Sequence, residues 1–314
     1  MTEATGPVAL EQRRRAFRDA LIEHGWLLTS QAMALPGLGA QALAVYDGLT
    51  AFVSRVARQE FTGTVVPVRF PPIFAARILE QTDYVASFPQ LLGTINSFSG
   101  DKKRFRELLA AYDAGEDWQA HLDPTGLALT SSACHPLYAW LENSKADNGL
   151  VYELTGDCFR HEPSDDPMRF IAFRMREYVR IGTAQDAVSH RDKSLDVARG
   201  ALESLGLEVD VVPANDPFFG RGGVILAANQ REAQAKFEVV VEVYPGTQTA
   251  IGSGNYHDTH FGDEFALVTP EGSPAHSACL GYGMERTIFA LAARHGFEIG
   301  DWPEAVRTAL SLDA

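Results

Sequence analysis

The stretch "DCFRHEPSDDPMRFIAFRMREY", residues 157–178, decides the fold. Two runs with strand-like composition flank a polar segment that contains two prolines, so the pattern predicts a β-hairpin with a long tip. The stretch also carries Arg160, Arg169, Arg174 and Arg176 in a chain that is acidic overall. Guanidinium groups match the geometry of phosphate oxygens, so we expect this hairpin to bind a small anion such as a nucleotide.

Composition limits the classes of protein that fit this chain. It has 314 residues, of which 46% are hydrophobic, and a formal net charge of −14. These values favour a globular protein with a substantial core. The acidic field opposes a polyanion such as tRNA. No apolar run is long enough to span a membrane and no signal peptide is evident, so a cytoplasmic protein without membrane contact is expected.

The order of elements predicts one mixed α+β domain over residues 1–314. Residues 1–125 read as mostly helical, and residues 126–300 read as a largely antiparallel sheet with helices around it. Ser99 or Asp101 is a candidate N-cap, and Gly206 and Gly296 are expected to end helices. Helices are expected at 8–25, 41–61, 99–122, 187–206 and 281–296, and strands within 62–74, 126–133, 151–162, 169–182, 207–214, 236–246 and 249–256.

Three motifs resemble those of class II aminoacyl-tRNA synthetases. Phe159-Arg160-His161-Glu162, the loop, and Arg174 to Tyr178 resemble motif 2, which reads F-R-x-E, a loop, and R-x-x-x-F. "GYGMERTIFAL" (281–291) resembles motif 3, with Gly281, Gly283 and Arg286. Residues 242–258 resemble the seryl-type stretch between them, and 69–90 is the candidate for motif 1, with Pro71 or Pro72 in a dimer interface. The resemblance implies an antiparallel sheet flanked by helices and a homodimer.

The resemblance also implies an ATP site. Arg160 would bind the α-phosphate and the charge that develops there, and Arg286 would hold the γ-phosphate, so these two arginines are the catalytic candidates. Tyr178 would stack on the adenine. A Thr at 249, where seryl-type enzymes have a Glu that ligates Mg²⁺, leaves the Mg²⁺ ligands open. The remaining expected ATP contacts are Glu162, Arg169, Phe170, Ala250, Ile251, Gly252 and Ser253.

The cysteines suggest a metal site. The chain has Cys134, Cys158 and Cys279, too few for a disulfide framework. By resemblance to the zinc-dependent, archaeal-type seryl enzymes, Cys134, Glu177 and Cys279 would bind Zn²⁺ and leave one position open for the substrate amine. The alternative is that both cysteines are core thiols. Cys158 and His135 are expected to be structural, and His257 and His260 are either lining a pocket or simply exposed.

The extent of the chain suggests the acceptor. A class II core with this cysteine pattern but without a recognisable tRNA-binding part resembles the amino acid:[carrier protein] ligases. The resemblance implies ATP-dependent activation of a small amino acid and transfer to the phosphopantetheine thiol of an acyl carrier protein. Two other readings stay open, namely a minimal seryl-like tRNA ligase and a catalytically silent regulatory paralogue. Retention of Arg160 and Arg286 disfavours the silent paralogue.

The substrate and the carrier surface rest on fewer residues. Gly182 stands where seryl-type enzymes have an acidic side chain, so glycine or alanine is expected in preference to serine. Asn255 and Glu177 are further candidates for substrate binding. The segments 187–206 and 218–236, with Arg221 and Arg231, are candidates for carrier docking, with ordinary surface as the alternative.

Overall fold

A seven-stranded sheet forms the centre of the molecule. The computed structural model describes residues 7–147, 149–216 and 234–313. The strand order is β3-β7-β8-β12-β11-β10-β9, with every neighbouring pair antiparallel except β3 and β7. The strands are β3 (Thr64–Val68), β7 (Leu150–Phe159), β8 (Ala172–Gly182), β9 (Val209–Pro213), β10 (Lys236–Tyr244), β11 (Thr247–Tyr256) and β12 (His276–Gly283).

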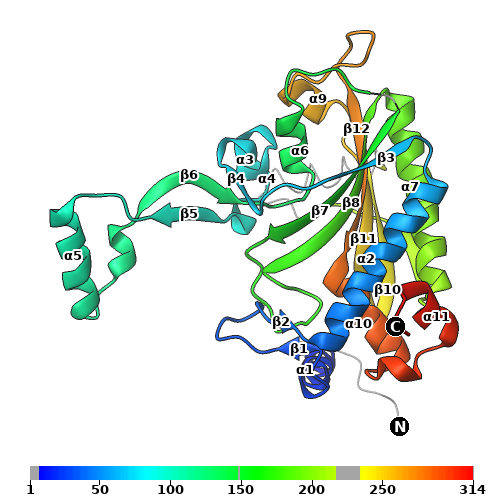
Figure 1. Cartoon of the computed structure of the whole chain (residues 1–314), viewed down its shortest axis with the longest axis horizontal. Coiled ribbons are helices and arrows are strands. Elements are labelled where there is room, and N and C mark those ends of the chain that lie inside the picture. Colours follow the sequence, from blue (N-terminus) through cyan, green and yellow to red (C-terminus); the bar gives the residue numbers. More distant parts are fainter. Residues whose placement is uncertain (1–6, 148, 217–233, 314) are drawn as a thin grey trace.

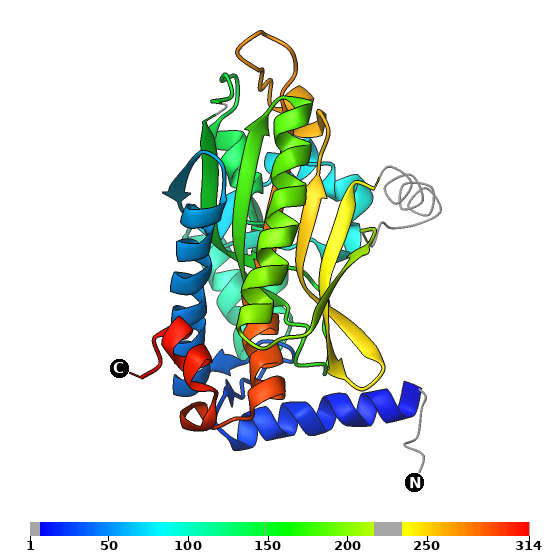
Figure 2. The ribbon, with the colours of Figure 1, turned by 90° about the vertical axis from the view of Figure 1, so that its right-hand side faces the viewer.

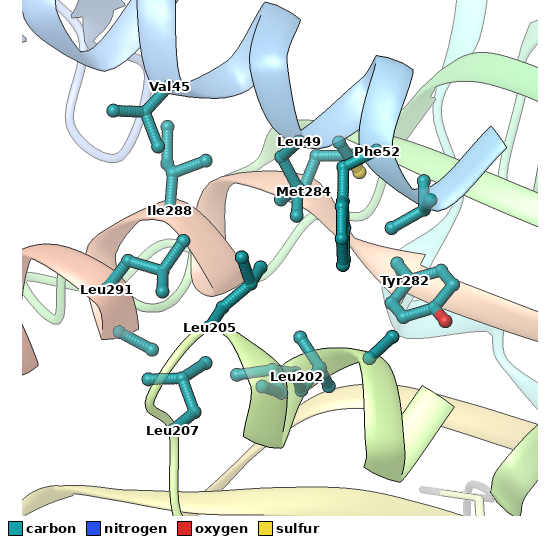
Figure 3. Packing of buried hydrophobic residues seen from close by; sticks show 14 of the residues in the cluster. Val45, Leu49, Phe52, Leu202, Leu205, Leu207, Tyr282, Met284, Ile288 and Leu291 are labelled. Carbon is teal, nitrogen blue, oxygen red and sulfur yellow. The ribbon is translucent and has the colours of Figure 1, made fainter. Parts of the chain in front are cut away.

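Three helices cover one face of this sheet. They are α2 (Ala40–Glu60), α7 (Ala184–Ser204) and α10 (Met284–His295), and Figure 2 shows α7 lying along the strands. Leu49 of α2, Leu202 of α7 and Ile288 of α10 meet in the main core, and each is fully buried (Figure 3). In each of these helices the apolar residues recur at helical spacing and so form one stripe, and this stripe packs against the sheet.

The other face carries short helices and leaves room for a site. There α6 (His135–Trp140) and α9 (His260–Glu264) pack over β7, β8 and β12 in a second buried cluster that contains Cys134, Leu154 and Cys279. Alternation along each strand separates the two faces, so Val179 joins this second cluster while Tyr178 joins the helix-side core.

The first 129 residues contain more strand than the sequence predicted. A second sheet, in the order β4-β6-β5, projects from the body (Figure 1). At its far end α5 packs against η2, so the expected helix at 99–122 is a shorter helix followed by a 3₁₀ turn. The elements of this region are β4 (Ile73–Ala75), α3 (Arg77–Gln81), α4 (Tyr84–Ser87), η1 (Pro89–Leu91), β5 (Thr94–Ser97), α5 (Lys102–Asp113), η2 (Trp118–His121) and β6 (Asp123–Leu129).

Helix α1 lies at the base of the main sheet, and α11 packs against α2. Figure 2 shows α1 crossing this base. These elements are α1 (Pro7–Glu23), β1 (Leu27–Leu28), β2 (Gly37–Leu38), η3 (Ile299–Asp301) and α11 (Glu304–Leu310).

Several further boundaries are confirmed, and the expected start of the motif 3 helix is wrong. The predicted hairpin is the β7–β8 pair, closed by Phe159 opposite Ala172. Asp101 caps α5 by accepting from two backbone amides. The motif 3 helix begins at Met284, because Gly281 and Gly283 still pair within β12. Among the described residues, no helix is both long and apolar enough to cross a bilayer.

Candidate active site

A cavity of about 460 Å³ lies on the face of the main sheet opposite the three long helices. Strand β8 contributes side chains at every second position, from Phe173 through Met175 to Glu177. Glu177 on β8 pairs with Gly281 on β12, and Gly281 pairs with Ser253 on β11, so these three residues form one row across the sheet. Cys279 lies two positions from Gly281 on β12 and therefore faces the same side. The floor of the cavity is therefore the pleated sheet itself, which fixes the relative positions of these groups.

Most of the expected site residues line this cavity. Twelve of the fifteen candidates do so: Cys134, Arg160, Glu162, Phe170, Glu177, Ala250, Ile251, Gly252, Ser253, Asn255, Cys279 and Arg286. His135, His257 and His260 also line it. The segments that carry these residues lie far apart in the sequence, and the antiparallel order β8-β12-β11 brings them together.

Arginines define one end of the cavity. The Arg160 Nε donates to the backbone carbonyl of Ser131 at 3.2 Å, and its guanidinium lies 5.5 Å from the centroid of the Phe173 ring. Arg286 donates from Nε to the carbonyl of Met168 at 2.6 Å and from Nη1 to that of Ala250 at 3.0 Å. Neither guanidinium has a carboxylate among these hydrogen-bond partners, so both can meet a phosphate.

Two thiols and a carboxylate define the other end. Glu177 is 1% exposed, and its Oε1 accepts from the Ser132 hydroxyl at 3.1 Å and from the Ala133 amide at 3.0 Å. Its Oε2 is buried and has no hydrogen-bond partner in the described part of the chain. Burial, together with the neighbouring Cys279, raises the pKa of Glu177 to about 7, although the hydrogen bonds from Ser132 and Ala133 lower it. An unpartnered buried carboxylate oxygen of this kind is a site prepared for a cation or a donor.

The thiols are linked to each other and to this carboxylate. A hydrogen bond between Cys134 and Cys279 raises the pKa of Cys134 and lowers that of Cys279. The Cys279 Sγ also lies 3.7 Å from His257 Nε2 and 3.6 Å from Asn255 Nδ2. Cys279 is therefore the thiol that the surroundings favour as thiolate.

Cys134, Glu177 and Cys279 are the residues expected to bind zinc. Over the described residues, the His, Cys, Asp and Glu side chains form no ready group of three that could hold a metal ion, so the zinc expectation is not confirmed. The donor chemistry does fit, because Cys134 and Cys279 are soft sulfur ligands and Glu177 has a free oxygen. Cys158 is buried and does not line the cavity, which agrees with a structural role.

Three expected site residues do not line the cavity. Tyr178 is 1% exposed and lies on the helix side of the sheet, where its hydroxyl donates to Glu153 at 3.2 Å. Gly182 ends β8 opposite His276, away from the arginines. Arg169 lies at the rim and contacts the site through an ion pair with Glu162 at 3.1 Å. The strand alternation places the Phe173 ring, which the sequence reasoning missed, where Tyr178 was expected.

Other features of the sequence prediction also change in the structure. Strand β7 ends at Phe159, so Arg160 and Glu162 reach the cavity from the following loop rather than from a strand face. Gly254 faces α7, since a Cβ there would lie 2.8 Å from Leu195 Cγ. Arg221, Arg231 and most of the segment 218–236 lie outside the described residues. Met175, Tyr84 and Glu285 are cavity residues for which the motifs gave no signal.

Comparison with known proteins agrees with this geometry. The solved structure of a Methanopyrus kandleri seryl-tRNA synthetase, bound to a tRNASec of A. aeolicus, matches 95% of this chain and 60% of that chain with a TM-score of 0.79 and 22% identity. A cytoplasmic serine–tRNA ligase from Naegleria fowleri, solved with AMP, matches 94% of this chain and 59% of that chain with a TM-score of 0.69 and 14% identity. The chain thus spans about 60% of these proteins, and they confirm the class II synthetase-like fold.

Two relatives that this chain matches over most of their length identify its family within the class II fold. No family model matches the chain. Amino acid–[acyl-carrier-protein] ligase 1 of Bradyrhizobium diazoefficiens is 36% identical over 272 residues, which is 86% of this chain and 83% of that protein. Ligase 2 of the same organism is 36% identical over 283 residues, covering 89% and 84%. With a class II fold, a cavity built from the expected residues and relatives of nearly the same extent, the chain belongs to the family of amino acid–[acyl-carrier-protein] ligases.

Proposed function

We propose that the chain activates a small amino acid with ATP and transfers it to the phosphopantetheine thiol of an acyl carrier protein. The observation that carries the proposal is a cavity with arginines at one end and the thiol–carboxylate group at the other. Family membership supplies the acceptor, because both ligases matched over most of their length are named for an acyl carrier protein. ATP is the expected co-substrate, with Mg²⁺ as its counter-ion.

The chemistry follows from the two ends of the cavity. The carboxylate of the amino acid attacks the α-phosphorus, the bond to the bridging oxygen breaks, and pyrophosphate leaves with that oxygen. Arg160 is placed to stabilise the charge that develops on the α-phosphate, and Arg286 to hold the outer phosphates. The carrier thiol, as thiolate, then attacks the acyl carbon, a thioester forms, and AMP leaves.

The thiol end would hold the amino group of the substrate. Cys134, Glu177 and Cys279 are the residues that would bind Zn²⁺, which supplies a Lewis acid to the amine when it is bound. In the chain itself, Ser132 and Ala133 hold Glu177 Oε1 and so aim the unpartnered Oε2. Mg²⁺ would draw its protein ligands from among the other carboxylates that line the cavity, which are Asp83, Glu162, Asp216, Glu238 and Glu285.

Glycine or alanine is the proposed substrate. The position of Gly182 outside the cavity gives this choice no support, but the wall beside Glu177 does. A Cβ on Gly281 would be in van der Waals contact with Met175 Cε at 3.4 Å and Glu177 Cγ at 3.5 Å, so these two side chains flank this part of the sheet closely. Ser132 Oγ contacts the Met175 sulfur at 3.9 Å from the other side. Little room remains for a long side chain here.

The test measures which acceptor, the carrier protein or tRNA, receives the activated amino acid. Zinc-loaded protein is incubated with ATP and labelled glycine, alanine or serine, and with either phosphopantetheinylated carrier protein or bulk tRNA. We expect glycine or alanine label on the carrier, released by thioester cleavage, and no label with Arg160→Ala. Label on tRNA would replace the proposal with a minimal tRNA ligase. A wild-type protein that labels neither acceptor, with the carrier shown to be competent, would favour the silent paralogue.

A further inference from the structure

The N-terminal helix α1 carries three arginines that face the loop between β7 and β8. Residues 160–171 form this loop, hereafter the β7–β8 loop, and it contains two adjacent aspartates. Arg14 Nε lies 2.9 Å from Asp166 Oδ2. Arg18 Nη1 lies 3.1 Å from Asp165 Oδ1, and Arg15 Nη2 lies 3.7 Å from Asp165 Oδ2. The loop that supplies Arg160, the proposed α-phosphate ligand, is therefore paired at its tip with a helix from near the start of the sequence.

Asp166 is the buried member of this set. Its side chain is 5% exposed, whereas that of Asp165 is 36% exposed. Its Oδ1 accepts from the Tyr244 hydroxyl at 2.8 Å and from the Met168 amide at 3.0 Å. The carbonyl of Asp166 accepts from the Arg169 amide at 2.9 Å. A buried carboxylate with this many donors fixes the backbone around it, because breaking any one contact leaves a buried polar group unsatisfied.

The contacts of Asp166 lead directly to the arginine end of the cavity. Met168 is 2% exposed, and its carbonyl accepts from Arg286 Nε at 2.6 Å. Arg169 pairs with Glu162 at 3.1 Å, and Glu162 lines the cavity. One backbone segment of four residues thus joins the α1 contact to both the guanidinium of Arg286 and the carboxylate of Glu162.

Helix α1 is itself anchored against the sheet. The Phe17 ring makes an edge contact with the Tyr244 ring at 6.1 Å, and Arg13 donates to the Pro245 carbonyl at 3.1 Å. Tyr244 touches both α1 and Asp166, so the helix and the loop share one rigid support on β10. The helix can therefore hold the loop in place instead of moving with it.

We propose that α1 positions the nucleotide end of the cavity, with Asp166 as the positioning residue that connects Arg14 to Met168 and Arg286. The inference rests on the proposed ATP-dependent activation. It adds that the geometry of Arg286 depends on an ion pair outside the cavity. Loss of the pair releases Met168 and with it the partner of Arg286 Nε, so binding of ATP weakens while binding of the amino acid, at the thiol end, is spared.

The test compares variants on the two sides of the contact. Arg14→Gln and Asp166→Asn are measured by amino-acid-dependent ATP–pyrophosphate exchange and by calorimetric titration with ATP. We expect the KM and the Kd for ATP to rise by about three- to tenfold, and the KM for the amino acid to stay within about twofold. Arg13→Gln is the matched control, because Arg13 lies on the same helix and bonds to the Pro245 carbonyl rather than to the loop.

A charge exchange gives a second, independent arm. Asp165→Arg replaces two ion pairs with repulsion between like charges, because the new arginine faces Arg15 and Arg18, and it should raise the KM for ATP. Adding Arg18→Asp restores one pair of opposite charges and should lower that KM again in part. This pair is half-exposed, so the variants test the inference even if Asp166→Asn fails to fold.

The outcomes separate this inference from the proposed function. A purely structural role predicts a lower melting temperature with both KM values unchanged or with both raised equally, and either result would overturn the inference. If the wild type shows no amino-acid-dependent exchange, the proposed function fails, and the ATP titrations still decide whether α1 affects the nucleotide end. If the wild type is active and Arg14→Gln binds ATP normally, only the inference is lost.

Discussion

At the scale of single residues, the ring of Phe173 is the side chain best placed to stack on the adenine. It lines the cavity and lies beside the Arg160 guanidinium. Stacking of a base on an aromatic ring contributes about 1–3 kcal/mol. We therefore expect Phe173→Ala to raise the KM for ATP by about tenfold or more in ATP–pyrophosphate exchange, with a smaller effect on the KM for the amino acid.

Tyr178→Phe is the control for this prediction. Tyr178 is buried on the other face of β8, and its hydroxyl donates to Glu153 at 3.2 Å. Loss of this hydrogen bond should lower the free energy of unfolding by about 1 kcal/mol and leave the KM for ATP unchanged. The opposite pattern, with ATP binding weakened by Tyr178→Phe and spared by Phe173→Ala, would mean that β8 presents its other face to the nucleotide.

The difference between these two rings shows where reasoning from sequence reaches its limit. Arg169 to Phe173 and Arg174 to Tyr178 both read as R-x-x-x-aromatic, and they differ by five positions. Residues an odd number of positions apart on a strand point to opposite faces, so Phe173 and Tyr178 cannot both face the cavity. Aligning the motif on one ring or the other therefore decides which face of the strand is expected to line the site. The sequence identified the arginine-bearing hairpin, but the register that selects the cavity residues depends on how β8 pairs with β7 and β12.

Buried His190 gives a prediction about pH. Burial lowers the pKa of His190 to about 4, from 6.5. Between these values the unfolded chain binds a proton that the folded chain does not, so stability falls as the pH falls from about 6.5 to 4, by roughly 3 kcal/mol. Urea unfolding of wild type and His190→Gln at pH 7 and pH 4 measures this as a difference between the two proteins. Equal losses of stability in both proteins would show that His190 is not the source.

At the scale of elements, α7 packs on β11 where glycine leaves space for it. A Cβ on Gly254 would lie 2.8 Å from Leu195 Cγ, whereas a Cβ on Gly200, within α7 itself, meets nothing within 4 Å. We expect Gly254→Ala to lower the free energy of unfolding by about 1–3 kcal/mol through overpacking. Gly200→Ala should raise it by about 0.5–1 kcal/mol, because alanine is the better helix former.

Urea unfolding of these two variants measures both effects on the same helix. If both substitutions stabilise the protein, α7 does not pack closely on β11. Loss of amino-acid binding in Gly254→Ala, with stability unchanged, would instead mean that Gly254 faces the cavity and not α7.

Element boundaries were predictable where a local signal marks them. Asp101 and Gly296 are such signals, and both act as expected, Asp101 as the N-cap of α5 and Gly296 at the end of α10 with a positive φ. The start of the motif 3 helix carried no comparable signal. Gly281 and Gly283 can enter a helix or end a strand, and pairing with Glu177 and Met175 on β8 decides for the strand.

At the scale of the whole molecule, the convergence of Cys134, Glu177 and Cys279 follows from sheet order rather than from local sequence. Glu177 and Cys279 lie on neighbouring strands, and Cys134 arrives from the connection between β6 and α6. Only the resemblance to class II synthetases anticipated this meeting, because the strands that join them are far apart in the chain. The projecting sheet was predicted only in part: the motif 1 candidate, 69–90, contains β4, and the strand expected within 126–133 overlaps β6, whereas β5 had no sequence signal.

The projecting sheet has one covered and one exposed apolar face. Phe74 and Ala128 are buried on the inner face, whereas Ile73 and Leu127, on the outer face, are 39% and 38% exposed. Farther out on α5, apolar residues recur on one side, with Tyr112 61% exposed. Exposed apolar surface of this kind is typical of an interface, and β4 lies within the segment 69–90 that resembles motif 1, for which the resemblance implies a dimer contact. We expect a homodimer that covers this face.

Sedimentation equilibrium should therefore give twice the 34.3 kDa of one chain. The double variant Ile73→Glu/Leu127→Glu places two charges on the outer face of the sheet and should sediment as a monomer, because an unpaired charge is costly to bury in an interface. Leu28→Glu is the matched control: Leu28 is 53% exposed on β1, which belongs to a separate two-stranded sheet, and the variant should remain a dimer. A wild type that sediments as a monomer at micromolar concentration contradicts the dimer, and a dimer that survives the double variant places the interface elsewhere.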